Sequence, residues 1–219
     1  MSAGISYQGI DEMRQACGGA GFTNYAAIAD VFADVAPGPT YEGINVVMLQ
    51  QSARYLFKQC RSLQKGKTLT GFFEYMNRTK ELCSTKSSAK TVEEFLDFDH
   101  IDQAMATRSA YYIDYTFKLM SESNEPTKVK DNELFAFEVQ KMSKMHISYI
   151  MFKTAKSQID LFKFKDDKLK PLVELLIKLF AVNYIREDPV DLFEIGFFGR
   201  GSSKLIDAAF KKLLVDLRP

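Results

Sequence analysis

Residues 36–57, APGPTYEGINVVMLQQSARYLF, open the most regular helical pattern of the chain. From this stretch onward, apolar residues recur at spacings of 3, 4, 3, 4 and 3, which places them on one face of an amphipathic helix. The residues of this stripe are Val46, Leu49, Ala53, Leu56, Cys60 and Leu63. We therefore expect a helix over 44–64 that buries the stripe against other helices and ends near Lys65 and Gly66.

Four later segments show similar periodicity, over residues 99–121, 131–161, 170–185 and 202–216. Ser202 or Ser203 is expected to cap the last of these helices. Before residue 44 we expect a short helix that ends in glycines near residue 17, and then one or two helical turns. Alternation of apolar and polar residues is nearly absent, which predicts few or no strands. The predicted fold is an all-α bundle in which each long helix buries one stripe.

Composition excludes several classes of protein. The 219 residues include 29 Lys and Arg and 28 Asp and Glu, so a net charge of +1 provides no global field for nucleic acid or an anionic membrane. Three separated cysteines argue against a disulfide framework and favour a reducing compartment. Two histidines and no C-x-x-C make a histidine- or thiolate-based metal site improbable. Because no secretory signal and no membrane-length apolar run is visible, we expect a soluble intracellular protein.

Glu42 is the sole acidic residue between Asp34 and Glu74, and it directly precedes a glycine and the predicted helix. One interpretation is favourable interaction of a carboxylate with the helix N-terminus. The other is a general base, because the apolar neighbours would desolvate the carboxylate and raise its pKa toward working pH. The pattern by itself leaves both open.

The segment ACGGAGF, residues 16–22, gathers three glycines after a predicted helix. Such glycines either cap a helix with a tight turn or let the backbone approach a flat or phosphorylated group. The segment is not G-x-G-x-x-G and follows no predicted strand, so a Rossmann site is excluded. His146 falls on the apolar stripe of its helix and is expected to be a hydrogen-bonded core residue.

Together, IDEMRQACGGAGF (residues 10–22) and PTYEGINVVMLQQSARYLFK (39–58) resemble the acyl-CoA oxidase family of flavoproteins. The family has an ACGGHGY stretch, then TYEGDN or FEGEN opening a helix rich in LLQxARYL. The resemblance is strong up to about residue 66. It is looser afterwards, where MHISYIMFK (145–153) and GSSKLIDAAFKKLLVDLRP (201–219) are similar to parts of the family's second helical domain.

The resemblance implies α,β-desaturation of a fatty acyl-CoA, with FAD as cofactor and dioxygen reduced to hydrogen peroxide, as in fatty acid β-oxidation. Glu42 would be the catalytic base that removes the α-proton. It also implies FAD binding, shared across a dimer interface in the family, and peroxisomal localisation, although the C-terminus LVDLRP is no S-K-L address. The implied cofactor-binding residues are Gly18, Gly19, Gly21, Gly43, Ile44 and Asn45.

The sequence also departs from the family pattern. Ala20 replaces the usual histidine, Phe22 replaces tyrosine, and Ile44 replaces an acidic or polar residue. The family's N-terminal helical domain, β-barrel and most of the first helical bundle precede the matching region. We therefore expect a bundle incomplete at both ends.

The expected layout has three parts. Residues 1–66 would form the end of the first helical domain, 67–98 a connector, and 99–219 the second helical domain. The missing first helices would leave part of the 46–63 stripe uncovered, which favours a homodimer or a heteromer that supplies the missing domains.

The leading hypothesis is the C-terminal portion of an acyl-CoA oxidase, inactive without those domains. The alternative is a non-catalytic all-α structural or assembly subunit derived from such an oxidase. An acyl-CoA dehydrogenase, which passes electrons to a flavoprotein acceptor, is the third hypothesis.

Overall fold

The computed structural model describes residues 2–41, 43–166 and 168–218. Within these ranges the regular elements are all helical, which confirms the all-α prediction. The chain divides into two compact units, Met1–Tyr55 and Leu56–Pro219, which we call the N-terminal and C-terminal units. No helix among the described residues is long and apolar enough to cross a membrane.

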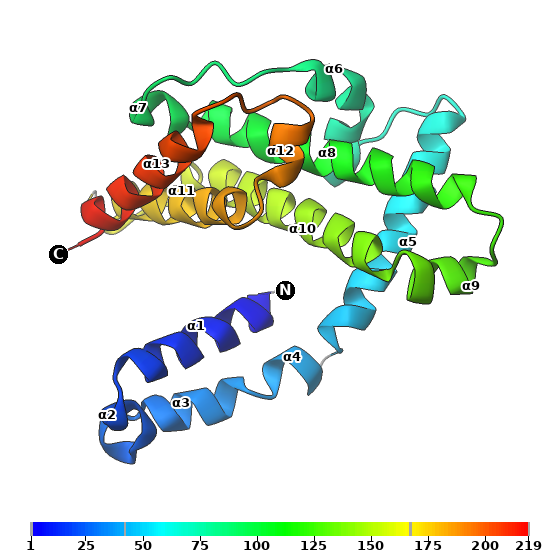
Figure 1. Ribbon diagram of the computed structural model, residues 1–219. Coiled ribbons are helices and arrows are strands. Elements are labelled where there is room, and N and C mark those ends of the chain that lie inside the picture. The colour runs from blue at the N-terminus through cyan, green and yellow to red at the C-terminus, as the bar shows by residue number, and fades with distance from the viewer. Residues whose placement is uncertain (1, 42, 167, 219) are drawn as a thin grey trace. The chain divides into compact units, whose positions relative to one another are not determined.

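The N-terminal unit is built on an antiparallel pair of helices, α1 and α3 (Figure 1). The rings of Tyr7 and Phe32 lie 5.3 Å apart between them, and the Arg14 guanidinium lies 5.0 Å from the Phe32 ring centroid. The helices that precede residue 42 are α1 (Ser2–Ala16), α2 (Gly19–Phe22), the 3-10 helix η1 (Asn24–Ala26), α3 (Ile28–Val35) and α4 (Gly38–Tyr41).

The first helix is longer than the sequence pattern indicated. It begins at Ser2 and includes Gly4 and Gly9, residues that lower helix propensity. The glycine segment adds a short helix of its own, α2, and the expected helical turns before residue 40 are α3 and α4.

Helix α5 (Asn45–Gln64) agrees with the helix expected over 44–64. Leu49, Ala53, Leu56 and Cys60 of the predicted stripe are buried. Val46 is 44% exposed, so the stripe is uncovered at the beginning of the helix.

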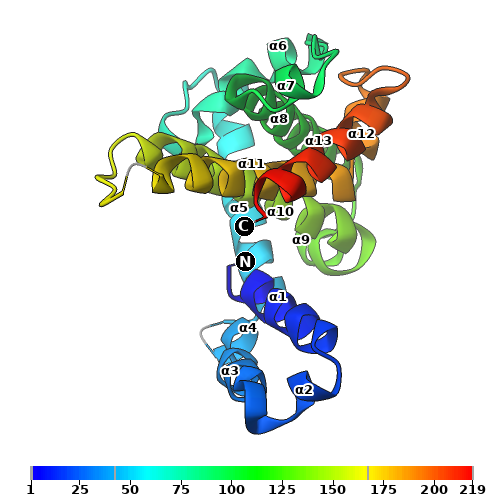
Figure 2. The same cartoon turned by 90° about the vertical axis from the view of Figure 1, so that its left-hand side faces the viewer.

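The C-terminal unit contains three long helices, of which α8 packs against α10 and α10 against α11 (Figures 1 and 2). Helix α13 packs against α11 and α7. The elements are η2 (a 3-10 helix, Gly71–Arg78), α6 (Thr79–Ser84), α7 (Val92–Phe95), α8 (Phe98–Glu122), α9 (Thr127–Val129), η3 (a π-helix, Lys130–Leu134), α10 (Ala136–Ile159), α11 (Leu169–Glu187), α12 (Val190–Glu194) and α13 (Ser202–Asp216).

The core of this unit is formed by aromatic and aliphatic side chains from every long helix. Helix α8 is buried on more than one side, because α6, α10, α11 and α12 all contact it. Among the largest fully buried side chains are Phe95, Ile101, Met105, Ile113, Met142, Phe152, Ile185, Leu192, Phe197 and Leu213.

Two helix boundaries differ from the predictions. The helix expected over 131–161 is interrupted, since the π-helix η3 leads to Phe135 at φ −122°, and α10 begins only at Ala136. Helix α13 is not capped by a serine: its N-cap is Gly201, with a left-handed φ of 95°. The backbone already turns at that glycine, so the chain enters the helix without a side-chain cap.

Candidate functional site

The glycine segment forms the end of α1 and an abrupt change of chain direction. The Gly18 N–H donates to the Gln15 carbonyl at 3.0 Å, and Gly18 then takes φ 55° and ψ −134°, a conformation open only to glycine. The helix-end interpretation of this segment is therefore confirmed. Gly18 and Gly19 are exposed, and a Cβ at either position would meet no other atom within 4 Å.

Gly21 has a different environment. It is buried, and a Cβ built there would lie 2.0 Å from the Arg14 carbonyl oxygen. Only glycine allows α2 to pack this closely on the last turn of α1. The chain's own packing thus explains Gly21 but not Gly19.

The predicted catalytic segment lies between α4 and α5. Glu42 itself is outside the described residues, so its role stays a prediction. Gly43 has a φ of 122°, and its N–H donates to the Thr40 carbonyl at 3.3 Å. Ile44 is 55% exposed, and Asn45 is the first residue of α5.

The two predicted segments lie near opposite ends of α1. Close to the beginning of α1, a Cβ at Gly4 would meet Asn45 Nδ2 at 2.9 Å, so the start of α5 packs there. The glycine segment instead packs on Arg14, ten residues further along. At 1.5 Å per residue these sites are about 15 Å apart along α1.

Exposed apolar side chains border both segments. Beside the glycines, Phe22 is 79% exposed and Tyr25 is fully exposed. Tyr41, the last residue of α4, is 69% exposed. Exposed apolar residues continue on α5 with Val47 and Met48. An apolar surface around a predicted site is typical of an interface with a ligand or a partner.

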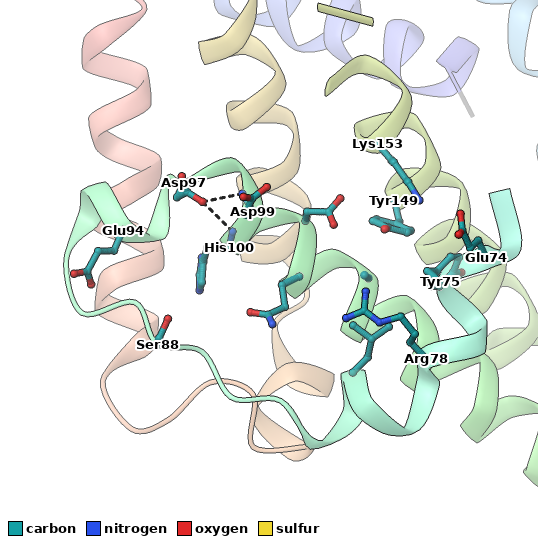
Figure 3. A pocket seen from close by; sticks show the side chains of 14 residues that line it. Glu74, Tyr75, Arg78, Ser88, Glu94, Asp97, Asp99, His100, Tyr149 and Lys153 are labelled. Carbon is teal, nitrogen blue, oxygen red and sulfur yellow. Dashed lines mark hydrogen bonds between the residues drawn. The ribbon is translucent and has the colours of Figure 1, made fainter. Parts of the chain in front are cut away.

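A second candidate is a polar hollow of about 740 Å³ in the C-terminal unit (Figure 3). Its lining is charged and comes from η2, α6, α8, α10 and the chain around α7: Glu74, Tyr75, Arg78, Leu82, Ser88, Glu94, Asp97, Asp99, His100, Asp102, Gln103, Ala106, Tyr149 and Lys153. Burial raises the pKa of Asp102. The sequence offered no signal for this hollow, because its residues are dispersed over 80 positions without a motif.

The hydrogen bonds of His100 fix its ring at the edge of this hollow. Its Nδ1 lies 3.0 Å from the Phe95 carbonyl oxygen, which can only accept, so Nδ1 carries the proton. Nε2 then accepts from the Ser87 hydroxyl at 2.8 Å. Burial lowers the pKa of His100, and its ring packs beside Phe95, Phe197 and Phe198. This arrangement ties the 85–91 loop to the core.

His146 is the hydrogen-bonded core residue that the sequence predicted. Its Nδ1 lies 2.8 Å from Tyr75 Oη, which also lies 2.7 Å from Ser109 Oγ, and its ring stacks on Phe73 at 5.2 Å. Burial lowers the pKa of His146 to about 4. No group of three or more potential metal ligands occurs among the residues that the structure describes.

Comparison with known proteins assigns both units to one family. The family profile "Acyl-CoA oxidase, C-alpha1 domain" matches residues 1–57, and the profile "Acyl-CoA oxidase" matches residues 97–219. Mouse (Mus musculus) peroxisomal acyl-coenzyme A oxidase 1 is 25% identical over 219 residues, which cover 96% of this chain and 32% of the mouse protein. The Arabidopsis thaliana protein of the same name is 37% identical over 101 residues, 46% of this chain and 15% of that protein.

Solved structures agree with these matches. An acyl-CoA oxidase from tomato (Lycopersicon esculentum) matches with a TM-score of 0.93 at 25% identity, covering all of this chain and 33% of its own. Acyl-CoA oxidase-2 of Caenorhabditis elegans, solved with FAD, ascaroside-CoA and ATP, matches with a TM-score of 0.84 at 22% identity. The chain thus spans about a third of the relatives that it matches. Because a family profile covers more than half of its residues, this chain belongs to the acyl-CoA oxidase family.

Proposed function

We propose that this chain is the C-terminal part of an FAD-dependent acyl-CoA oxidase and acts together with the domains that complete the family fold. One observation carries the proposal. The TYEG motif, residues 40–43, precedes α5 in the sequence and lies inside the segment that matches the family's C-alpha1 domain. The resemblance of this motif to the family pattern implies that its glutamate is the catalytic base.

In this proposal Glu42 removes the α-proton of a fatty acyl-CoA thioester. Its backbone N–H would donate to the thioester carbonyl and stabilise the negative charge that develops there. Gly43 has a φ of 122°, a conformation that favours glycine, two residues before α5 begins. The apolar side chains of Tyr41 and Ile44 would exclude water once an acyl chain covers them.

In this proposal the glycines at the end of α1 would bind FAD. Gly18 and Gly19 expose backbone where a Cβ would meet only open space, so a large group can approach their peptide units. Packing within the chain does not require a glycine at position 19. In this proposal the requirement for glycine there comes from close approach of the adenosine diphosphate portion of FAD. When bound, FAD would accept the β-hydrogen as hydride and pass the electrons to dioxygen, which yields hydrogen peroxide.

The separation of the two segments along α1 supports an assembly of more than one chain or domain. Gly18 and Gly19 would contact the cofactor at one end, whereas buried Gly21, also expected from the sequence to contact it, would hold α2 in place beside them. Gly43, Ile44 and Asn45 would lie along the flavin at the other end. The exposed apolar residues of α5 would be covered by the completing domains, in a homodimer or a heteromer. The peroxisomal relatives support a peroxisomal site of action. Residues 1–66, 67–98 and 99–219 would then be the end of the first helical domain, a connector and the second helical domain.

The test is Glu42→Gln in the native complex, with its partners retained. The substitution keeps the shape of the side chain and removes the base. We expect a flavin absorbance band in both complexes, but anaerobic bleaching by a fatty acyl-CoA, and hydrogen peroxide on readmission of air, only in the wild type. Loss of about 10²–10⁴-fold in turnover is expected for removal of a general base. Unchanged turnover would refute the role of Glu42.

The second candidate is a non-catalytic assembly subunit descended from an oxidase. The observation that favours it is the replacement of polar or histidine positions of the family pattern by Ala20, Phe22 and Ile44. This candidate would be established by a stable native complex that has no flavin band and whose assembly is unchanged by Glu42→Gln. A flavin that bleaches but yields no hydrogen peroxide would instead indicate a dehydrogenase.

A further inference from the structure

The end of the hairpin between α10 and α11 exposes large apolar side chains. Leu161 is 73% exposed, Phe162 66% and Leu169 42%, whereas Ile159, just before them, is 6% exposed. The Phe164 ring lies 5.1 Å from that of Phe162. Figure 2 shows that the chain here extends away from the helices of the C-terminal unit.

Lysines are interspersed with these apolar residues. Residues 160–170 contain four lysines and three aspartates, a local net charge of +1. Lys163, Lys165 and Lys168 are exposed. We call Leu161, Phe162, Lys163, Lys165, Lys168 and Leu169 the tip surface.

Local contacts close the base of the hairpin and direct its residues outward. Lys170 Nζ and Asp160 Oδ1 form an ion pair at 2.6 Å across the two arms. The Phe162 N–H donates to the Gln158 carbonyl at 3.0 Å, and the Leu169 N–H donates to the Asp166 carbonyl at 3.0 Å. Backbone hydrogen bonds and the Asp160–Lys170 pair therefore hold both arms of the hairpin, while the side chains of the tip surface are exposed.

We propose that the tip surface binds peripherally to an anionic lipid surface. Leucine and phenylalanine side chains enter the boundary between headgroups and acyl chains, while neighbouring lysine side chains extend their ammonium groups to the phosphates. The nearly neutral chain has no long-range field, so the attraction arises from the lysines within a Debye length of the membrane.

The composition of the tip favours lipid over a protein partner. The buried centres of protein interfaces are depleted in lysine, whereas the tip places lysine at alternate positions between aromatic residues. Because of this alternation the tip has no continuous apolar area like the centre of a protein interface. It instead suits the membrane interface, where acyl chains and anionic headgroups lie side by side. Binding through few apolar residues is expected to be weak, reversible and sensitive to salt.

The test is cosedimentation of the whole chain, in its native complex, with phosphatidylcholine vesicles that contain about one third phosphatidylserine. We expect binding that weakens about tenfold in Leu161→Ser/Phe162→Ser and, separately, in Lys163→Glu/Lys165→Glu, and that weakens as salt rises. Matched controls on α13, Leu214→Ser/Val215→Ser and Lys204→Glu/Lys211→Glu, change similarly exposed residues and should bind like the wild type.

Three results would overturn the proposal. The first is that the wild type does not bind vesicles. The second is that the tip variants bind as well as the wild type, and the third is that the α13 controls lose as much binding as the tip variants. Loss of a protein component from the complex of the tip variants, with no vesicle binding by the wild type, would assign the tip to a protein interface. Circular dichroism of each variant checks that the helices persist.

Discussion

At the scale of single residues, neighbouring glycines of one segment have different reasons for being glycine. Gly18 is needed for its backbone conformation, and Gly21 for its approach to Arg14. Gly19 satisfies neither requirement within the chain. Substitutions can therefore separate packing from ligand contact within four residues.

Gly21→Ala should destabilise the N-terminal unit by about 1–3 kcal/mol, the usual cost of overpacking. The new methyl would lie 2.0 Å from the Arg14 carbonyl oxygen, which is backbone and cannot rotate away. Urea unfolding followed by circular dichroism measures the loss. Gly19→Ala, with open space at Cβ, is the control and should unfold like the wild type. Equal stability of the two variants would contradict this account of the packing.

His146 should make the stability of the C-terminal unit depend on pH. Its pKa is about 4 in the fold and 6.5 in the unfolded chain, so the unfolded chain binds more protons between these values. The stabilisation is complete above pH 6.5 and is lost as pH falls toward 4, on the order of 3 kcal/mol in all.

The measurement is the urea midpoint across this pH window for the wild type and for His146→Gln. The glutamine can still accept a hydrogen bond from Tyr75 but does not titrate there. The difference between the two proteins should therefore shrink toward pH 4, although His100, with its own lowered pKa, keeps some pH dependence in both. Parallel curves would show that His146 does not titrate as described.

At the scale of elements, one lysine links α10 to the chain around α12. Lys141 Nζ lies 2.9 Å from a carboxylate oxygen of Asp188 and 2.9 Å from one of Asp191, and 4.6 Å from the Tyr112 ring centroid. Burial raises the pKa of Asp191 despite this pairing. Arg108, almost fully buried on α8, donates to the Tyr184 and Asp188 carbonyls beside it.

Lys141→Met should destabilise the C-terminal unit by about 3 kcal/mol, because Asp191, 5% exposed, would be left without its cation. Adding Asp191→Asn should restore part of the loss. The free energy of unfolding in urea distinguishes these proteins. Lys118→Met, which breaks the exposed pair with Asp114, is the matched control and should change little. A Lys141 effect no larger than the Lys118 effect would mean that the pair contributes little.

At the scale of the whole molecule, the buried core lies almost entirely in the C-terminal unit. Among the described residues, Leu49 and Ala53 are the buried apolar residues that precede residue 56. The N-terminal unit instead exposes large apolar side chains such as Phe22, Tyr25 and Ile44. Such a unit has little to stabilise it unless another surface covers it.

Hydrogen exchange of the isolated chain should therefore show two levels of protection. Amides of α1 and α3 should exchange much faster than those of α8 and α10, which line the core. If the proposed completing domains cover the exposed apolar residues of α1 and α3, protection of these helices should rise in the native complex. Equal protection of the two units in the isolated chain would contradict this prediction.

The helical class, the bounds of α5 and α8 to within a residue or two, and family membership could all be predicted from the sequence. These depend on local signals: the spacing of apolar residues along one helix, and rare motifs such as CGG and YEG. The same signals predicted the buried, hydrogen-bonded state of His146. These signals did not predict the interruption at η3. There the Lys130 ammonium group donates to the carbonyls of Met120 and Ser123 at the end of α8. This contact joins two segments and does not arise from a local helix preference.

Contacts between residues distant in sequence could be read only from the three-dimensional structure. The hollow beside His100, the Lys141 contacts with Asp188 and Asp191, and the contact of Gly21 with Arg14 each join positions that no local pattern relates. It also separated the two predicted cofactor segments by about 15 Å along α1, although they are close in sequence. The physical reason is that periodicity specifies which face of a helix is apolar, whereas the neighbour that covers that face is selected by packing in three dimensions.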